Sequence, residues 1–106
     1  MEKDTMGKWI NFGELFEVFP INECPELSNC IYVFISRRNI SPIHYISYGE
    51  VENNPQSAKD FIPNTNFNYP ITHIAIYKII SEDERKEIIT QLKNSNIKWV
   101  LQEANK

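Results

Sequence analysis

The side chains best suited to chemistry in this 106-residue chain are three tyrosines and a few charged residues. The tyrosines, which could line a pocket, are Tyr32, Tyr45 and Tyr48. The candidates for binding are Arg37, Arg38, His44 and Glu50. The two arginines could contact a phosphate or an acidic partner, although charged residues at a turn are usually only solvated. Aromatic residues in a hairpin usually form cross-strand pairs, so packing is the simpler explanation of the tyrosines.

The cysteines do not indicate a metal site. Cys24 and Cys30 are too close together for a framework of several disulfides, and they have no Cys or His partner at zinc-site spacing. We expect two free, buried thiols. His44 and His73 lie in predicted strands without a neighbouring carboxylate, so we expect hydrogen-bonded strand residues rather than bases or ligands. We therefore predict no metal site and no cofactor from the residues themselves.

Composition limits the classes of partner. The net charge is −3 and the pI is near 5.3, which argues against a protein whose affinity comes from neutralising many phosphates. The charge is uneven, at −4 in residues 1–53 and +1 in residues 54–106, and such an asymmetry could help to dock a protein partner. The first residues lack the pattern of a signal peptide, and no apolar run is long enough to span a membrane. We expect a cytoplasmic protein that does not bind membranes.

Three strands are predicted. Residues 30–36 are continuously apolar, β-branched and aromatic, which indicates a central strand covered on both faces. A turn at 37–42 leads to a second strand at 43–49, and the two strands form an antiparallel hairpin whose pairing ends at Gly49. Residues 71–80 form the third strand. The prediction is an α+β domain with a small three-stranded antiparallel sheet flanked by helices.

Helices are predicted around this sheet. Residues 9–19 fit a short helix that ends before Pro20. Asn53 or Asn54 caps a short helix over 56–61 with Pro55 at its first position, and residues 62–70 form a surface loop.

The clearest helix start lies further along the chain. Ser81 and Glu84 form a capping box at the start of a helix over 82–93, whose apolar face has Arg85 on its edge. Asn94 or Asn96 ends this helix. Residues 97–101 form a last strand or an apolar tail on the sheet.

The order of hairpin, short helix, loop, strand and capped helix resembles the GIY-YIG nuclease family over residues 18–97. Cys30-Ile31-Tyr32 is similar to the first motif, with cysteine in place of glycine. The second motif is matched by Ser47-Tyr48-Gly49, or in another register by Tyr45-Ile46-Ser47. The resemblance implies one GIY-YIG-like domain over 1–106, with a lead-in at 1–29, a core at 30–97 and a frayed tail at 98–106.

The resemblance also implies that the catalytic residues have been replaced. Active members use an arginine on the first helix to stabilise charge on the phosphate and a glutamate on the later helix to hold a divalent metal. Between Gly49 and Ile80 this chain has no arginine, only Lys59 and Lys78, and Ile89 stands where the glutamate belongs. The alignment further implies that Tyr32 faces the helix that carries Ile89.

We therefore expect a catalytically inactive binding or regulatory module that binds another protein through the hairpin face and the loop 62–70. The alternative is a divergent endonuclease dependent on Mg²⁺ or Mn²⁺. Its candidate residues are Tyr32 or Tyr45, Lys59 and a carboxylate such as Glu50. A third possibility is nucleic-acid binding without cleavage.

Overall fold

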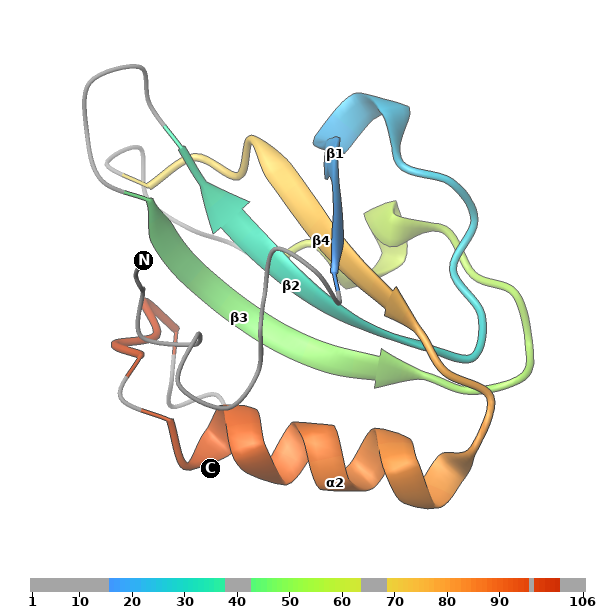
Figure 1. Ribbon diagram of the computed structural model, residues 1–106. Helices are drawn as coiled ribbons and strands as arrows, with labels where there is room; N and C mark the ends of the chain where they lie inside the picture. Colours follow the sequence, from blue (N-terminus) through green and yellow to red (C-terminus); the bar gives the residue numbers. More distant parts are fainter. Residues whose placement is uncertain (1–15, 38–42, 64–68, 96, 102–106) are drawn as a thin grey trace.

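An antiparallel sheet of four strands organises the chain (Figure 1). The computed structural model describes residues 16–37, 43–63, 69–95 and 97–101. The elements along the chain are β1 (Glu17–Pro20), the 3-10 turn η1 (Ile21–Glu23), β2 (Cys30–Ser36), β3 (His44–Val51), the 3-10 turn η2 (Ala58–Phe61), β4 (His73–Lys78) and α2 (Glu82–Lys93). The strand order is β1-β4-β2-β3, and every neighbouring pair is antiparallel.

Strand β2 is the centre of the sheet, as its sequence predicts. It pairs with β3 on one side and with β4 on the other, and all seven of its residues are buried. The hairpin of β2 and β3 is confirmed, as is the third predicted strand, which is β4. The predicted turn at the tip of the hairpin falls mostly on residues 38–42, which lie outside the described residues.

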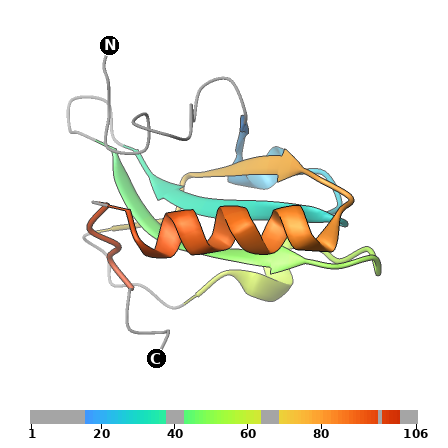
Figure 2. The same ribbon diagram turned by 60° about the horizontal axis from the view of Figure 1, so that its bottom comes forward.

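The two faces of the sheet carry separate apolar clusters. Helix α2 covers one face, where Leu92 packs on Ile31, Val33 and Ile35 of β2 (Figure 2). The opposite face is covered by η2 and by the segment between η1 and β2, which contributes Leu27. A seven-residue strand that is apolar at every position except the last, Ser36, is stable here because both of its faces are removed from water.

Helix α2 begins and ends where the local sequence predicts. The N–H of Glu84 donates to the Ser81 Oγ at 3.3 Å, and the N–H of Asn94 donates to the Thr90 carbonyl at 3.0 Å. Three acidic residues in the first turn face the positive end of the helix dipole. Arg85 is the exception, because it is buried rather than placed at the edge of the apolar face.

The predicted short helix over 9–19 is wrong where the structure describes it. Residues Glu17–Pro20 form strand β1, which pairs with β4 and makes the sheet four-stranded instead of three-stranded. Residues 9–15 lie outside the described residues. An extended backbone places Phe16 in the cluster under α2, where it is buried, and Phe19 in the opposite cluster, where it is half-buried. The β4 edge supplies backbone partners that sequence periodicity cannot reveal.

Two predictions around β3 also need correction. Gly49 does not end the pairing, since it lies opposite Tyr32 and the strand continues to Val51. The short helix is a 3-10 turn over Ala58–Phe61, and its cap is Ser57, whose Oγ accepts from the Lys59 N–H at 3.2 Å. The chain is still extended at residue 56 because that residue forms a bridge with Leu27.

The segment 97–101 is an apolar tail on the sheet and not a strand. The N–H groups of Val100 and Leu101 donate to the carbonyls of Tyr45 and Ile46, both at 3.0 Å. The tail therefore covers the outer edge of β3 over the first part of that strand.

Candidate functional site

The three candidate tyrosines lie on two different faces of the sheet. The Tyr32 ring belongs to the cluster opposite α2, where it stacks on Phe61 with ring centroids 5.2 Å apart. Tyr45 and Tyr48 belong to the face under α2 and both pack against Trp99, at 6.1 and 4.7 Å. They cannot line one pocket. Tyr32 also does not face the helix that carries Ile89, contrary to what the GIY-YIG alignment implies.

Burial controls the chemistry of Tyr32. It raises the pKa of this phenol to about 12, and it also raises the pKa of Tyr48. Both side chains are therefore protonated at neutral pH. A phenolate that could accept a proton from water or a nucleophile is not available at Tyr32.

This shift predicts how stability depends on pH. The folded chain keeps the Tyr32 proton to a higher pH than the unfolded chain, whose phenol titrates near 10. Stability from this group is therefore constant below pH 10 and decreases by about 2 to 3 kcal/mol as the pH rises to about 12. Urea unfolding at several pH values measures the decrease. In Tyr32→Phe the curve should be flatter over this interval, and identical slopes in the two proteins would contradict the assignment.

Glu50 is held in an ion pair that the sequence did not reveal. Its Oε2 lies 2.8 Å from the Nε of Arg85, and its Oε1 lies 3.5 Å from the Nζ of Lys86. The Arg85 side chain is 4% exposed and that of Glu50 is 17% exposed. A charged guanidinium is this deeply buried only when its donors are satisfied.

Arg85 donates further hydrogen bonds to two other segments, the link between β4 and α2 and the residue before β2. Its Nη1 donates to the carbonyls of Ile79 and Ile80 at 3.0 and 2.8 Å, and to the Asn29 Oδ1 at 3.3 Å. Asn29 has a φ of 48°, a left-handed conformation that asparagine tolerates. Arg85 thus joins α2 to β3 and to the start of β2, and both it and Glu50 serve to hold these elements together.

The other sequence candidates lie apart from this ion pair. Lys59 is exposed on η2, and Arg37 is exposed beyond β2, where its N–H donates to the Thr72 Oγ1 at 2.9 Å. The His44 ring packs edge-on against Tyr69 with centroids 5.0 Å apart. Arg38 lies outside the described residues.

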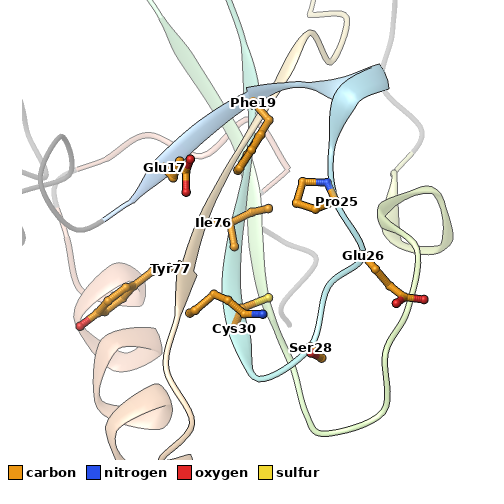
Figure 3. A pocket seen from close by; sticks show the side chains of 9 residues that line it. Glu17, Phe19, Pro25, Glu26, Ser28, Cys30, Ile76 and Tyr77 are labelled. Carbon is orange, nitrogen blue, oxygen red and sulfur yellow. The ribbon is translucent and has the colours of Figure 1, made fainter.

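A pocket of about 360 Å³ opens on the face opposite α2, beside β1 (Figure 3). Its apolar lining consists of Phe19, Pro25, Cys30 and Ile76. The polar groups around it are Glu17, Glu26, Ser28 and Lys78, and Tyr77 completes the lining. Figure 3 shows the side chains of Phe19, Ile76 and Pro25 around the same space, whereas the carboxylate of Glu26 points outward.

The chemistry of this pocket is that of a binding site. Cys30 is part of the lining, but burial raises the pKa of its thiol to about 11, so the sulfur is protonated and a poor nucleophile at neutral pH. Both cysteines are free, as predicted, although Cys24 is only half-buried. Apolar walls with a few charged groups at the rim are typical of sites that bind a ligand or a partner side chain.

Compared with known protein families, with curated proteins and with solved structures, the chain matches none of them.

The described residues contain neither a metal-binding cluster nor a helix that could cross a membrane. No group of three or more His, Cys, Asp and Glu side chains among these residues is arranged to hold a metal ion. No helix in the described part of the chain is long and apolar enough to cross a bilayer.

The sequence contained a weak signal for the pocket. Phe19, Pro25 and three glutamates lie within eleven residues of the lead-in, at 16–26, without a compensating lysine or arginine. A cluster of this kind indicates an acidic surface with apolar groups. That the surface surrounds a pocket follows only from the pairing of β1 with β4.

Proposed function

We propose that this domain is a non-catalytic binding module whose partner is another protein. The pocket beside β1 carries the proposal. It presents apolar walls and charged rim groups to a partner. Tyr32 and Glu50, by contrast, are engaged in the core and in the ion pair with Arg85. The acidic rim of the pocket also favours a protein partner over a nucleic acid, whose phosphates it would repel.

The likeness to the GIY-YIG scaffold is part of this proposal. This likeness is supported by the order of the elements, which is a hairpin, a further strand beside β2 and a capped helix. Tyr32 lies on the face of the sheet opposite α2, which argues against the residue-by-residue alignment with the nuclease family. We therefore propose a GIY-YIG-like arrangement of elements and take no catalytic residue from it.

The pocket replaces the surface that the sequence suggested. Both faces of the hairpin pack against other parts of the chain, and residues 64–68 of the loop 62–70 lie outside the described residues. The pocket is formed instead by β1, β4, the start of β2 and the segment 25–28. These are backbone-paired strands and a proline-containing segment, so the site is largely formed before binding.

Affinity capture from a lysate of the source cells tests the proposal. Ser28→Phe fills the pocket from its rim, and Thr90→Phe adds the same side chain on the exposed face of α2 as a matched control. We expect a stoichiometric partner to be retained by the native chain and by Thr90→Phe, and to be reduced about tenfold or more with Ser28→Phe. Mass spectrometry quantifies the retained protein. Equal retention by all three chains would contradict the proposal.

The endonuclease alternative makes an opposite prediction. Incubation with supercoiled and single-stranded DNA and with Mg²⁺ or Mn²⁺ should leave the DNA intact, because Tyr32 is a buried neutral phenol and Glu50 is paired with Arg85. Cleavage by the native chain that is lost in Tyr32→Phe, in a folded variant, would overturn the proposal.

A further inference from the structure

We infer that the partner binds as an extended basic segment that adds antiparallel to β1 and inserts one apolar side chain into the neighbouring pocket. This inference rests on the proposed function and specifies the chemistry of the partner. Three features support it: the outer edge of β1, the charge around it, and the position of the pocket.

The outer edge of β1 offers backbone hydrogen-bonding groups. The Ile21 N–H donates to the Thr72 carbonyl at 3.0 Å, in the same register that pairs Phe19 with Ile74. Residue pairs in an antiparallel ladder alternate between hydrogen-bonded and non-hydrogen-bonded. The N–H and C=O groups of Glu17 and Phe19 therefore point toward β4. The N–H and C=O of Val18 and the C=O of Pro20 therefore point away from the sheet. Among the described residues β1 is the last strand on this side, and Val18 is 41% exposed.

The charge around β1 and the pocket favours a basic partner. Glu17, Glu23 and Glu26 all lie in the segment from β1 to the pocket rim, and all three are exposed. Residues 16–28 contain no lysine or arginine, and Lys78 is the one cation that lines the pocket. Opposite charges on the two partners favour encounter and fix the register of binding.

The pocket lies within reach of a strand added to β1. Glu17 and Phe19 are on the same face as Ile76, which forms part of the pocket. An added strand would lie about 4.8 Å from β1, so a large side chain beside Phe19 can extend over the edge into the pocket. A volume of about 360 Å³ is enough for one such side chain.

These three features define an alternating peptide. In an antiparallel addition the residue opposite Val18 shares its face, while its two neighbours lie opposite Glu17 and Phe19. A lysine opposite Glu17 and a phenylalanine opposite Phe19 fit the charge and the pocket. The sequence order is then Phe-Val-Lys, and Lys-Val-Phe-Val-Lys contains it.

A fluorescein-labelled peptide, Thr-Lys-Val-Phe-Val-Lys-Thr, is the probe, and its binding to the full chain is measured by fluorescence polarisation. We expect it to bind about tenfold tighter than the same peptide with glutamate in place of lysine. N-methylation of both valines removes the N–H groups that would donate to the carbonyls of Val18 and Pro20, and should weaken binding about tenfold. N-methylation of the phenylalanine, whose N–H points outward, is the control.

Protein variants locate the contact. The double variant Glu17→Lys, Glu26→Lys should reverse the preference between the basic and the acidic peptide. Val18→Pro removes an outward N–H at an edge position where proline is tolerated, and Ser28→Phe closes the pocket; each should weaken binding about tenfold. Circular dichroism confirms that each variant is folded, and the charge variant tests the site even if Val18→Pro does not fold.

Several results would overturn the inference. They are no saturable binding of the basic peptide, equal affinity for the acidic peptide, equal effects of the two N-methylations, or tighter binding of a single-stranded oligonucleotide. If Ser28→Phe abolishes capture of the cellular partner while the peptide experiments fail, the proposed function stands and the strand addition does not. If the peptide experiments fail and Ser28→Phe leaves capture of the cellular partner unaffected, the proposed function and the strand addition are both wrong.

Discussion

Replacement of Arg85 by methionine should lower the free energy of unfolding by about 3 to 5 kcal/mol. The change leaves the Glu50 carboxylate, 17% exposed, without its closest cation, and it leaves the carbonyls of Ile79 and Ile80 without a donor from the helix. An unpaired buried charge costs more than the same charge in water, which is the reason for the large value. Urea unfolding followed by circular dichroism measures the loss.

Lys86→Met is the matched control for this prediction. It removes the same charge from the next residue of α2, and Lys86 also contacts Glu50, at 3.5 Å. Its side chain is 58% exposed, so solvent screens the contact and we expect a loss of about 1 kcal/mol or less. A loss for Arg85→Met that is no larger than the loss for Lys86→Met would show that the buried ion pair does not stabilise the fold.

A double-mutant cycle with Glu50→Gln separates the ion pair from the other bonds of Arg85. Once Glu50 is neutral, removal of Arg85 no longer leaves a charge unpaired, so the two losses should be less than additive by about 1 to 3 kcal/mol. The result also concerns function. A strong coupling means that Glu50 acts as a structural partner of Arg85, whereas additive losses would leave this carboxylate available as a metal ligand.

Gly49→Ala should destabilise the chain by about 1 to 3 kcal/mol through overpacking. A Cβ at this position would lie 2.5 Å from the Tyr32 Cζ and closer still to the Tyr32 Oη. The Tyr32 ring has little room to move away, because it is held against Phe34 and Phe61 at centroid distances of 5.2 Å. Thermal or urea unfolding measures the effect.

Two further variants identify the cause of this loss. Tyr32→Phe removes the oxygen that meets the new methyl group, so part of the stability lost in Gly49→Ala should return in the double variant. Ser47→Ala, two residues earlier on the same face of β3, adds no atom and should change stability by about 0.5 kcal/mol or less. If Tyr32→Phe gives no recovery, the close approach of Tyr32 is not the reason for glycine at position 49.

Gly49 also illustrates the difference between a motif and a packing constraint. The resemblance to the nuclease family placed this glycine in a motif, and the weakness of glycine within strands suggested that it ends the pairing. In the structure it pairs with Tyr32 in the interior of β3, and its missing side chain makes room for the phenol. One cross-strand contact explains both the glycine and the tyrosine without catalysis.

The elements that could be predicted are those whose signals are local. Residues 30–35 are apolar at every position, and Ser81 and Glu84 form a cap three residues apart, so β2 and α2 have the predicted places. The hairpin follows because a turn separates two β-prone runs. In each case the signal comes from residues close together in the sequence, or from the residue types alone.

The elements that were missed depend on distant partners. β1 is a strand because β4, more than fifty residues later, offers it a paired edge, as Glu17 opposite Ile76 shows. Arg85 is buried because Glu50, 35 residues earlier, lies across from it. Helical periodicity treats an arginine at the edge of an apolar face as solvated, since it has no information about a carboxylate on another element.

Local patterns along the chain were thus enough to specify an α+β domain with a central hairpin and a capped helix. The acidic composition also argued against a protein whose affinity comes from neutralising many phosphates. Only the tertiary contacts decided which face of the sheet each tyrosine occupies and which carboxylate pairs with Arg85. They also decided that the acidic lead-in borders a pocket. The physical reason is that burial, ion pairing and cavities are properties of residues brought together from distant positions, and long-range pairing in a sheet determines which residues meet.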